Sequence, residues 1–137
     1  PDVVTAIHKA YFDAGSNVVC ANTFGANPLK FAPDELEAIV AAAIANAGAA
    51  RAASAAGEKF VALDIGPTGR LLRPLGPLDF EDAVAAFAGT VRLGAKYGAD
   101  LIFIETMNDS YETKAALLAA RVTSRSSSPM LTARTAS

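Results

Sequence analysis

The sequence predicts an α/β fold with parallel strands, and three observations lead to this prediction. Segments whose apolar residues recur at helical spacing alternate with short apolar runs. The short runs lie about forty residues apart, which leaves room for a helical crossover between parallel strands. Polar residues, glycine or proline follow each short run directly. Right-handed crossovers between neighbouring parallel strands are therefore expected throughout.

The first helix is predicted to begin at Pro1, since proline suits a first helical turn, and to end before Gly15. One face of this helix carries Val4, Ile7, His8 and Tyr11. Residues 17–24 (NVVCANTF) form the first predicted strand, because the run is short, apolar and rich in β-branched residues. We expect His8 on the helix surface and Cys20 as a small buried residue within the strand.

The second helix is predicted to begin at Pro33 and to end by Gly57, because a proline followed by acids favours a helix N-terminus. Its apolar positions at helical spacing are Leu36, Ile39, Val40, Ala43, Ile44 and Ala47. Residues 59–64 (KFVALD) form the second predicted strand. A loop rich in glycine and proline follows between Gly66 and Pro77.

The third helix is predicted to be capped by Asp79. Its apolar stripe contains Phe80, Val84, Phe87 and Val91. Residues 101–104 (LIFI) form the third predicted strand, which ends at Glu105, and a fourth helix is predicted over about 109–121. About three parallel strands and four helices amount to somewhat under half of a (β/α)8 barrel, and a doubly wound sheet satisfies the same alternation. Because the pattern begins with a helix, we expect a preceding strand to be missing.

Composition and charge exclude several classes of function. The 137-residue chain is 52% hydrophobic and has a formal net charge of −2, which gives no electrostatic footprint for nucleic acid or an anionic membrane. No apolar run reaches the roughly 18 residues of a membrane span, and the first residues do not resemble a signal peptide. The single cysteine excludes a disulfide framework and a multi-cysteine metal site built from this chain alone. It also fits a reducing cytoplasm.

Polar side chains at the ends of the predicted strands are the candidate site residues. They are Asn22 and Thr23 after the first strand, Asp64 at the end of the second, and Glu105 at the end of the third. In parallel α/β folds, ligands bind at the carboxyl ends of the strands. Each residue also has a structural interpretation. Asn22 and Thr23 could satisfy backbone groups, Asp64 could form a turn, and Glu105 could make a salt bridge. Asp64 and Glu105 could also be the acid–base pair of an unrelated α/β enzyme.

Three motifs resemble the homocysteine S-methyltransferase family. They are ANTFGAN (21–27), DIGPTGRLLRPLG (64–76) and FIETMNDSYETKAAL (103–117). Their combination is most similar to the homocysteine-binding module of the cobalamin-dependent methionine synthase branch. Each motif is modest alone, but three in order at appropriate intervals are specific. The resemblance covers about 1–121, which we take as a partial homocysteine-binding barrel domain.

The resemblance implies a partial (β/α)8 TIM-type barrel that binds homocysteine at its C-terminal mouth. It also implies a zinc ion, held in that family by three cysteine thiolates, that ligates the substrate sulfur and lowers its pKa. The methyl group would come from methylcobalamin on another module, recharged from methyltetrahydrofolate. An intact parent would therefore carry cobalamin- and folate-binding modules beside this one, and methyl transfer to the homocysteine thiol would give methionine.

The resemblance also assigns roles to the candidate residues. Glu105 matches the acidic residue that holds the substrate ammonium group, and Asn22 and Thr23 match strand-end contacts near the substrate. Asp64 matches a rim position whose expected role is loop shaping. The zinc cysteines of the family follow later strands that are not in this sequence, and Cys20 does not match one. We therefore assign no catalytic or metal-binding residue, and expect the chain alone to bind no cofactor and to be inactive.

Two alternatives to this assignment stay open at the level of the sequence. One is a non-catalytic truncation product with exposed barrel edges, which would tend to aggregate. The other is an unrelated α/β barrel enzyme that uses Asp64 and Glu105 in acid–base catalysis. Zinc content and the substrate turned over would distinguish these alternatives.

The composition changes after Arg121. Residues 122–137 contain five serines and three threonines but no acid, and are predicted to form an irregular tail. A shifted reading frame is a second interpretation. With suitable codons, the next frame encodes DLPVFVTNAYGEDGK, an apolar run followed by a polar loop, as expected for the next strand of a barrel.

Overall fold

The computed structural model of the chain describes residues 2–126 and 132–135. Helices and strands alternate along the chain, as predicted. The elements are α1 (Asp2–Asp13), β1 (Val18–Cys20), α2 (Pro33–Ala52), β2 (Phe60–Ile65), α3 (Phe80–Lys96), β3 (Leu101–Ile104), α4 (Ser110–Ser126) and β4 (Thr132–Thr135). Every element except β4 overlaps a predicted one, so the predicted α/β fold is confirmed.

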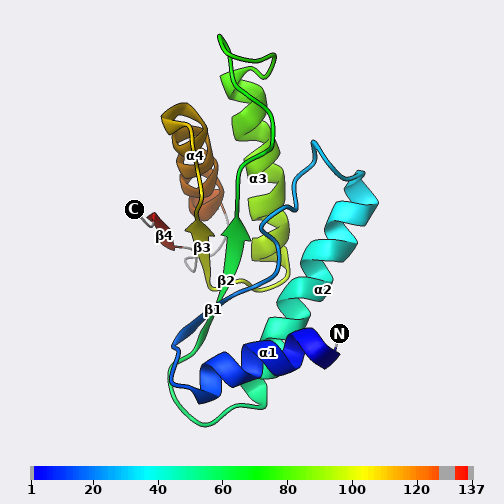
Figure 1. The fold of residues 1–137 in the computed structure, drawn as a ribbon, viewed down its shortest axis with the longest axis vertical. Coiled ribbons are helices and arrows are strands. Elements are labelled where there is room, and N and C mark those ends of the chain that lie inside the picture. The colour runs from blue at the N-terminus through cyan, green and yellow to red at the C-terminus, as the bar shows by residue number, and fades with distance from the viewer. Residues whose placement is uncertain (1, 127–131, 136–137) are drawn as a thin grey trace.

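The strands form one parallel sheet in the order β1-β2-β3-β4. Strand order therefore follows chain order without a reversal. With right-handed crossovers, such an order places all connecting helices on one face of the sheet. A doubly wound sheet would instead reverse its order at a switch point and carry helices on both faces. The topology is that of a barrel segment, and in Figure 1 the heads of β2 and β3 point to the same end of the molecule.

The segment after Arg121 differs from the prediction of an irregular tail. Helix α4 continues to Ser126, and the backbone of Thr132–Thr135 pairs with β3 as the parallel strand β4. Main-chain pairing explains this result, because β3 would otherwise expose a row of unpaired N–H and C=O groups. The rest of the predicted tail, residues 127–131 and 136–137, lies outside the described residues.

The core lies between the sheet and the helices, and small residues allow the two layers to approach closely. Its largest fully buried side chains include Val40, Leu63, Phe87, Val91 and Ile102. Gly94 of α3 sits directly on β2, where a β-carbon would come within 2.6 Å of the Leu63 side chain. The alanines of α2 have a similar role, since Ala43, Ala47 and Ala50 are all buried.

The opposite side of the sheet carries the candidate site residues. Leu63 faces α3, and successive strand residues alternate between faces, so Ala62 and Asp64 face away from the helices. The strand register extends this assignment to the neighbouring strands. We call this side the inner face and define it by Cys20, Ala62, Asp64, Leu101, Phe103 and Glu105.

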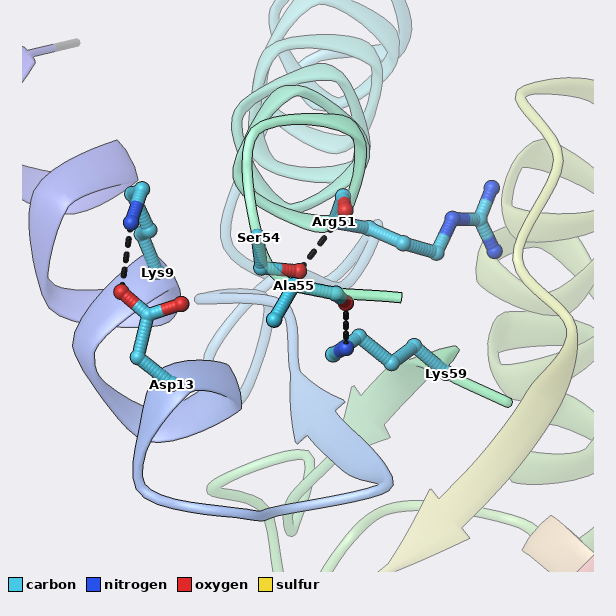
Figure 2. A network of polar contacts seen from close by, with 6 residues as sticks. All are labelled: Lys9, Asp13, Arg51, Ser54, Ala55 and Lys59. Carbon is cyan, nitrogen blue, oxygen red and sulfur yellow. Dashed lines mark hydrogen bonds and ion pairs between the residues drawn. The ribbon is translucent and has the colours of Figure 1, made fainter. Parts of the chain in front are cut away.

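Polar contacts gather near the end of α2 and the amino-terminal end of β2 (Figure 2). Ser54 donates a 2.8 Å hydrogen bond to the Arg51 carbonyl, and Lys59 donates to the Ala55 carbonyl. The Arg51 guanidinium pairs with Asp100 at 2.6 Å, and the same Asp100 oxygen accepts the Val61 N–H at 2.8 Å. These contacts have a structural role, which is typical of this end of a barrel.

Two local predictions are wrong. His8 is not on the surface of α1 but buried, beside a pocket that Val19 and Cys20 of β1 also line, and burial lowers the pKa of its imidazole. Asp79 occupies the position before α3 but makes no side-chain capping hydrogen bond. Its carboxylate pairs instead with the Arg73 guanidinium at 2.9 Å. Across the described residues, no helix combines the length and the hydropathy that crossing a bilayer requires.

Candidate substrate site at the carboxyl ends of the strands

Thr23 ties the loop after β1 to the end of β2. Its hydroxyl donates a 2.8 Å hydrogen bond to the Asp64 carbonyl and accepts the Asp64 N–H at 3.0 Å. The side chain is fully buried. Thr23 therefore satisfies backbone groups, which was the structural interpretation of this residue, and it fixes the main chain of Asp64 on both sides.

Gly66 allows the same loop to fold tightly over the end of β2. The Phe24 ring lies against its α-carbon, where a β-carbon would come within 2.5 Å of the ring. The Gly66 N–H also donates a 3.1 Å hydrogen bond to the Phe24 carbonyl. Only glycine fits this position without displacing the ring.

Asp64 and Glu105 lie on the inner face, on neighbouring strands. Asp64 is opposite Phe103 in the register, and the Glu105 N–H extends the ladder by donating to the Ile65 carbonyl at 3.1 Å. Glu105 is thus one layer nearer the mouth than Asp64. Asp64 is only 8% exposed, and its Oδ1 has no hydrogen-bond partner. Burial first, and then the Glu105 charge, raise the pKa of Asp64 to about 6.

The backbone directly after Glu105 is strained. Thr106 has a φ of 58°, in the left-handed region that a β-branched residue rarely adopts. Such strain costs about 1–3 kcal/mol and persists where the surroundings fix the conformation, often at functional sites. This kink ends β3 and sets the direction in which the chain leaves Glu105.

Cys20 belongs to this group of residues, although we expected it in the core. It is half-buried on the inner face, in register with Ala62. Burial, followed by the charges of Asp64 and Glu105, raises the pKa of its thiol to about 11. The alternation of side chains along a strand could have predicted that Cys20 and Asp64 share a face, but only if it was known which residues of β1 point away from the helices.

We expect Cys20 to be a slow nucleophile. At pH 8 a thiol with this pKa is ionised in roughly one molecule in a thousand, against about a quarter for an ordinary cysteine. Alkylation of the folded chain by iodoacetamide should therefore be slower, by about tenfold or more, than alkylation of an unstructured peptide with an ordinary cysteine, since the greater nucleophilicity of a high-pKa thiolate offsets part of the difference in ionisation. Asp64→Asn should accelerate it by removing a nearby charge. A rate equal to that of the unstructured peptide would contradict this account.

A buried carboxylate that the sequence analysis missed holds the loop after β2. Glu112 of α4 accepts the Thr68 N–H at 2.8 Å and the Thr68 hydroxyl at 2.6 Å. Both side chains are buried. The sequence signal for Glu112 was its position on the alanine-rich buried face of the fourth helix. No hydrogen bond joins the Asp64 carboxyl to this loop among the described residues, so Thr68 and Glu112 shape it instead.

Thr68→Val should destabilise the chain by about 1–3 kcal/mol, because it removes a hydrogen bond to a buried carboxylate. Thr113→Val is the matched control, since the Thr113 hydroxyl donates only to the neutral Asp109 carbonyl, at 2.9 Å. The control should cost about 1 kcal/mol or less. Urea denaturation measures both free energies of unfolding, and equal costs would argue against a special role for Glu112.

Asn22 follows the end of β1, and a separate cleft lies beside the loop after β2. The Asn22 side chain is exposed, and the described structure gives it no hydrogen bond. A cleft of about 520 Å³ lies between the loop after β2 and the start of α4, with Arg70, Leu71 and Asn108 on its walls. Neither Asp64 nor Glu105 lines this cleft.

The described residues contain no group of three or more His, Cys, Asp or Glu side chains placed to hold a metal ion. Within that part of the chain, the donor set therefore does not fit a zinc centre. What the geometry brings together is a carboxyl pair, Asp64 and Glu105, beside the Cys20 thiol. Such a pair can accept hydrogen bonds from a cation or exchange a proton.

A parallel sheet in chain order with acidic residues at the strand ends defines a segment of a (β/α)8-type barrel with a polar mouth. A sequence model described as homocysteine S-methyltransferase matches residues 1–135, so the chain belongs to the homocysteine S-methyltransferase family. The match extends past the expected limit at Arg121.

The similar proteins agree with this membership. The methionine synthase of Mycobacterium tuberculosis is 32% identical over 127 residues, which is 88% of this chain but 11% of that protein. The metallated form of the homocysteine methyltransferase MmuM from Escherichia coli superposes with a TM-score of 0.78 at 22% identity, over 98% of this chain and 50% of that one. Its oxidized form gives 0.81 at 21% identity, over 99% and 50%. The chain thus spans 11% of the methionine synthase and 50% of MmuM, whose fold is a TIM barrel, and the predicted partial barrel is confirmed.

Proposed function

We propose that this chain is part of a homocysteine S-methyltransferase of the methionine synthase type and carries one side of the homocysteine site. The supporting observation is the Asp64–Glu105 pair, placed on the inner face at the strand ends of a chain that belongs to this family. The reaction of the intact protein would be methyl transfer to the homocysteine thiol, giving methionine.

The chain's own residues would bind and orient the substrate. Glu105, half-buried at the mouth, accepts hydrogen bonds from the substrate ammonium group. Thr23 keeps the end of β2 in place through its two bonds to the Asp64 main chain. Asn22 is exposed at the same end and offers an amide to the polar part of the substrate.

Activation of the sulfur would need groups from outside this chain. In the family a zinc ion supplies Lewis acidity that makes the substrate thiolate available. Cys20 is no substitute ligand, because its pKa is raised and no further metal-binding side chains gather around it among the described residues. We propose that this chain alone neither binds zinc nor transfers a methyl group. The cobalamin- and folate-binding modules of an intact parent would complete the reaction in the cytoplasm.

Metal content and methyl transfer, measured in parallel for this chain and for its intact parent, test the proposal. We expect stoichiometric zinc and methionine formation from the parent, and neither from the chain. Glu105→Gln in the parent should raise the KM for homocysteine about tenfold or more. An unchanged KM for homocysteine in this variant would contradict the assignment of Glu105 to the homocysteine site. Turnover of a phosphate or carbonyl substrate without zinc would favour the acid–base alternative.

The reading frame of the last segment is a separate proposal. We propose that residues after 121 come from a shifted frame, supported by the change in composition and by the apolar run that the next frame can encode. The two frames predict different residues for the strand beside β3. Sequencing the gene across codons 115–137 decides between them, and an in-frame match to this tail in sister genes would contradict the shift.

A further inference from the structure

Strand β1 forms one edge of the parallel sheet, and β4 forms the other. The Asn17 carbonyl and the Ala21 N–H both bond to β2, at 2.8 Å each. Because the main-chain groups of successive strand residues point to opposite sides, those of Val18 and Cys20 point away from β2. Strand β1 therefore presents hydrogen-bonding groups along a side that no strand of the described chain covers.

An apolar groove runs beside this edge, between α1 and β1. Val3, Ile7 and Tyr11 are four residues apart, so they form one stripe along α1, and each is more than half exposed. Ile7 and Tyr11, together with Val18, line a cavity of about 410 Å³. Within the described residues, neither α2 nor α3 exposes a large apolar side chain. An apolar stripe on a helix ordinarily packs against other elements, so the groove is a surface suited to being covered.

The repeating order of the elements indicates what covers it. Each of the four strands follows a helix, from α1 and β1 to α4 and β4. In a parallel α/β fold, each such helix packs over two neighbouring strands. Helix α1 packs on β1 and α2, but β1 is the last strand of the described sheet on that side. The segment that completes the pattern is a strand parallel to β1, placed at its open edge.

A second copy of this chain offers such a strand in its own β4. That strand runs parallel to the others and forms the opposite edge. Rotating one copy by half a turn about an axis along the strands places β4 of each copy beside β1 of the other, and every strand keeps its direction. Two copies have eight strands and eight helices, the full set of a (β/α)8 barrel. The chain also spans 50% of MmuM, whose fold is that barrel.

We propose that two copies of this chain associate into one closed eight-stranded barrel through two identical seams. Each seam joins α1 and β1 of one copy to β4 of the other. The closure also covers the inner face, where Leu101 and Phe103 are only half-buried in the single chain. The inference depends on the edges of the sheet and not on the proposed function, so association and homocysteine binding are tested separately.

Sedimentation velocity and native mass spectrometry of the full chain test the association. We expect a concentration-dependent equilibrium between the 14.0 kDa chain and a species of twice that mass. Mixing with chain labelled with nitrogen-15 should give one mixed dimer and no larger species. A chain that stays monomeric up to its solubility limit overturns the proposal. A series of species beyond the dimer also overturns it, because edges that do not close on each other keep adding copies.

Amide hydrogen exchange locates the seam. In the dimer, the N–H groups of Val18 and Cys20 should exchange about tenfold or more slowly than they do in the dilute monomer. The Ala21 N–H bonds to β2 in either state and is the internal control, so its exchange should not change. If Val18 and Cys20 exchange at the same rate before and after dilution, the interface lies elsewhere and the seam is overturned.

A proline on β1 tests the main-chain pairing. Val18→Pro removes an N–H at the open edge and leaves the ladder to β2 intact, and proline is tolerated on edge strands. We expect this variant to weaken dimerisation by about tenfold or more. Val18→Thr keeps the N–H and the β-branched shape, so it is the matched control and should dimerise like the wild type.

A charge in the groove tests the packing of α1. Ile7→Glu should weaken dimerisation by about tenfold or more, because closing the seam would bury the new carboxylate. Leu75→Glu is the matched control, since Leu75 is 80% exposed in the loop after β2, away from both edges of the sheet. Circular dichroism verifies that each variant is folded. If Val18→Pro and Ile7→Glu both dimerise like the wild type, the assignment of the seam is overturned.

Discussion

Asp64→Asn should stabilise the folded chain at pH 8 by about 2–3 kcal/mol, since each unit of pKa shift corresponds to about 1.4 kcal/mol. The pKa of Asp64 is about 6 in the folded chain, against an ordinary value of 3.8 for an aspartate. The Asp64 carboxyl is protonated in both the folded and the unfolded chain while the pH is below the pKa of the unfolded state, so it then costs the folded chain no free energy. As the pH rises through the folded pKa, the free energy of unfolding falls, because the native state must then hold a buried charge.

Urea denaturation at several pH values measures this effect. The wild-type free energy of unfolding should fall between about pH 4 and pH 6, and the Asp64→Asn curve should lack that fall. At pH 4 the two proteins should be nearly equal. Glu105→Gln should give a smaller gain at pH 8, because burial and not Glu105 is the larger cause of the shift. Destabilisation by Asp64→Asn at pH 8 would contradict the raised pKa of Asp64.

Gly94→Ala should destabilise the chain by about 1–3 kcal/mol, the usual cost of overpacking a core. The new methyl group would lie 2.6 Å from one Leu63 methyl and 3.1 Å from the other. Leu63 is fully buried and cannot move into solvent. Either α3 moves away from β2, or Leu63 adopts an unfavourable rotamer.

Gly48→Ala on α2 provides the matched control. A β-carbon at Gly48 meets nothing within 4 Å, so this change should stabilise the chain by about 0.5–1 kcal/mol through helix propensity. Thermal and urea unfolding of both variants measure the difference. If Gly94→Ala were also stabilising, the close contact between α3 and β2 would be wrong.

Much of the fold could be predicted from the sequence because local patterns determine it. The run 101–104 forms β3 with the predicted bounds, and Pro33 begins α2 as expected. Asp109 also accepts the Tyr111 N–H at 2.8 Å, as a residue before a helix should. These features depend on a few neighbouring residues and need no knowledge of the rest of the molecule.

The misplaced residues depend on contacts between distant segments. His8 is buried once α1 packs against the rest of the fold, and no spacing within α1 reveals which side of the helix is covered. The pairing of Thr68 with Glu112 joins residues 44 positions apart. For Asp64 the sequence located a carboxylate at a strand end. Its lack of a donor became visible only with the neighbouring strands in place.

The pairing of β4 along the edge of β3 depends on extended backbone more than on the side chains of β4. A segment reading Thr-Ala-Arg-Thr pairs with the apolar β3, although it has no apolar alternation of its own. An edge that accepts such a segment acts as a template for any extended chain that reaches it. Wherever β4 detaches, the exposed backbone of β3 could pair in the same way with an extended segment of another polypeptide. Protection of this edge would then depend on how often β4 detaches, and not only on the free energy of global unfolding.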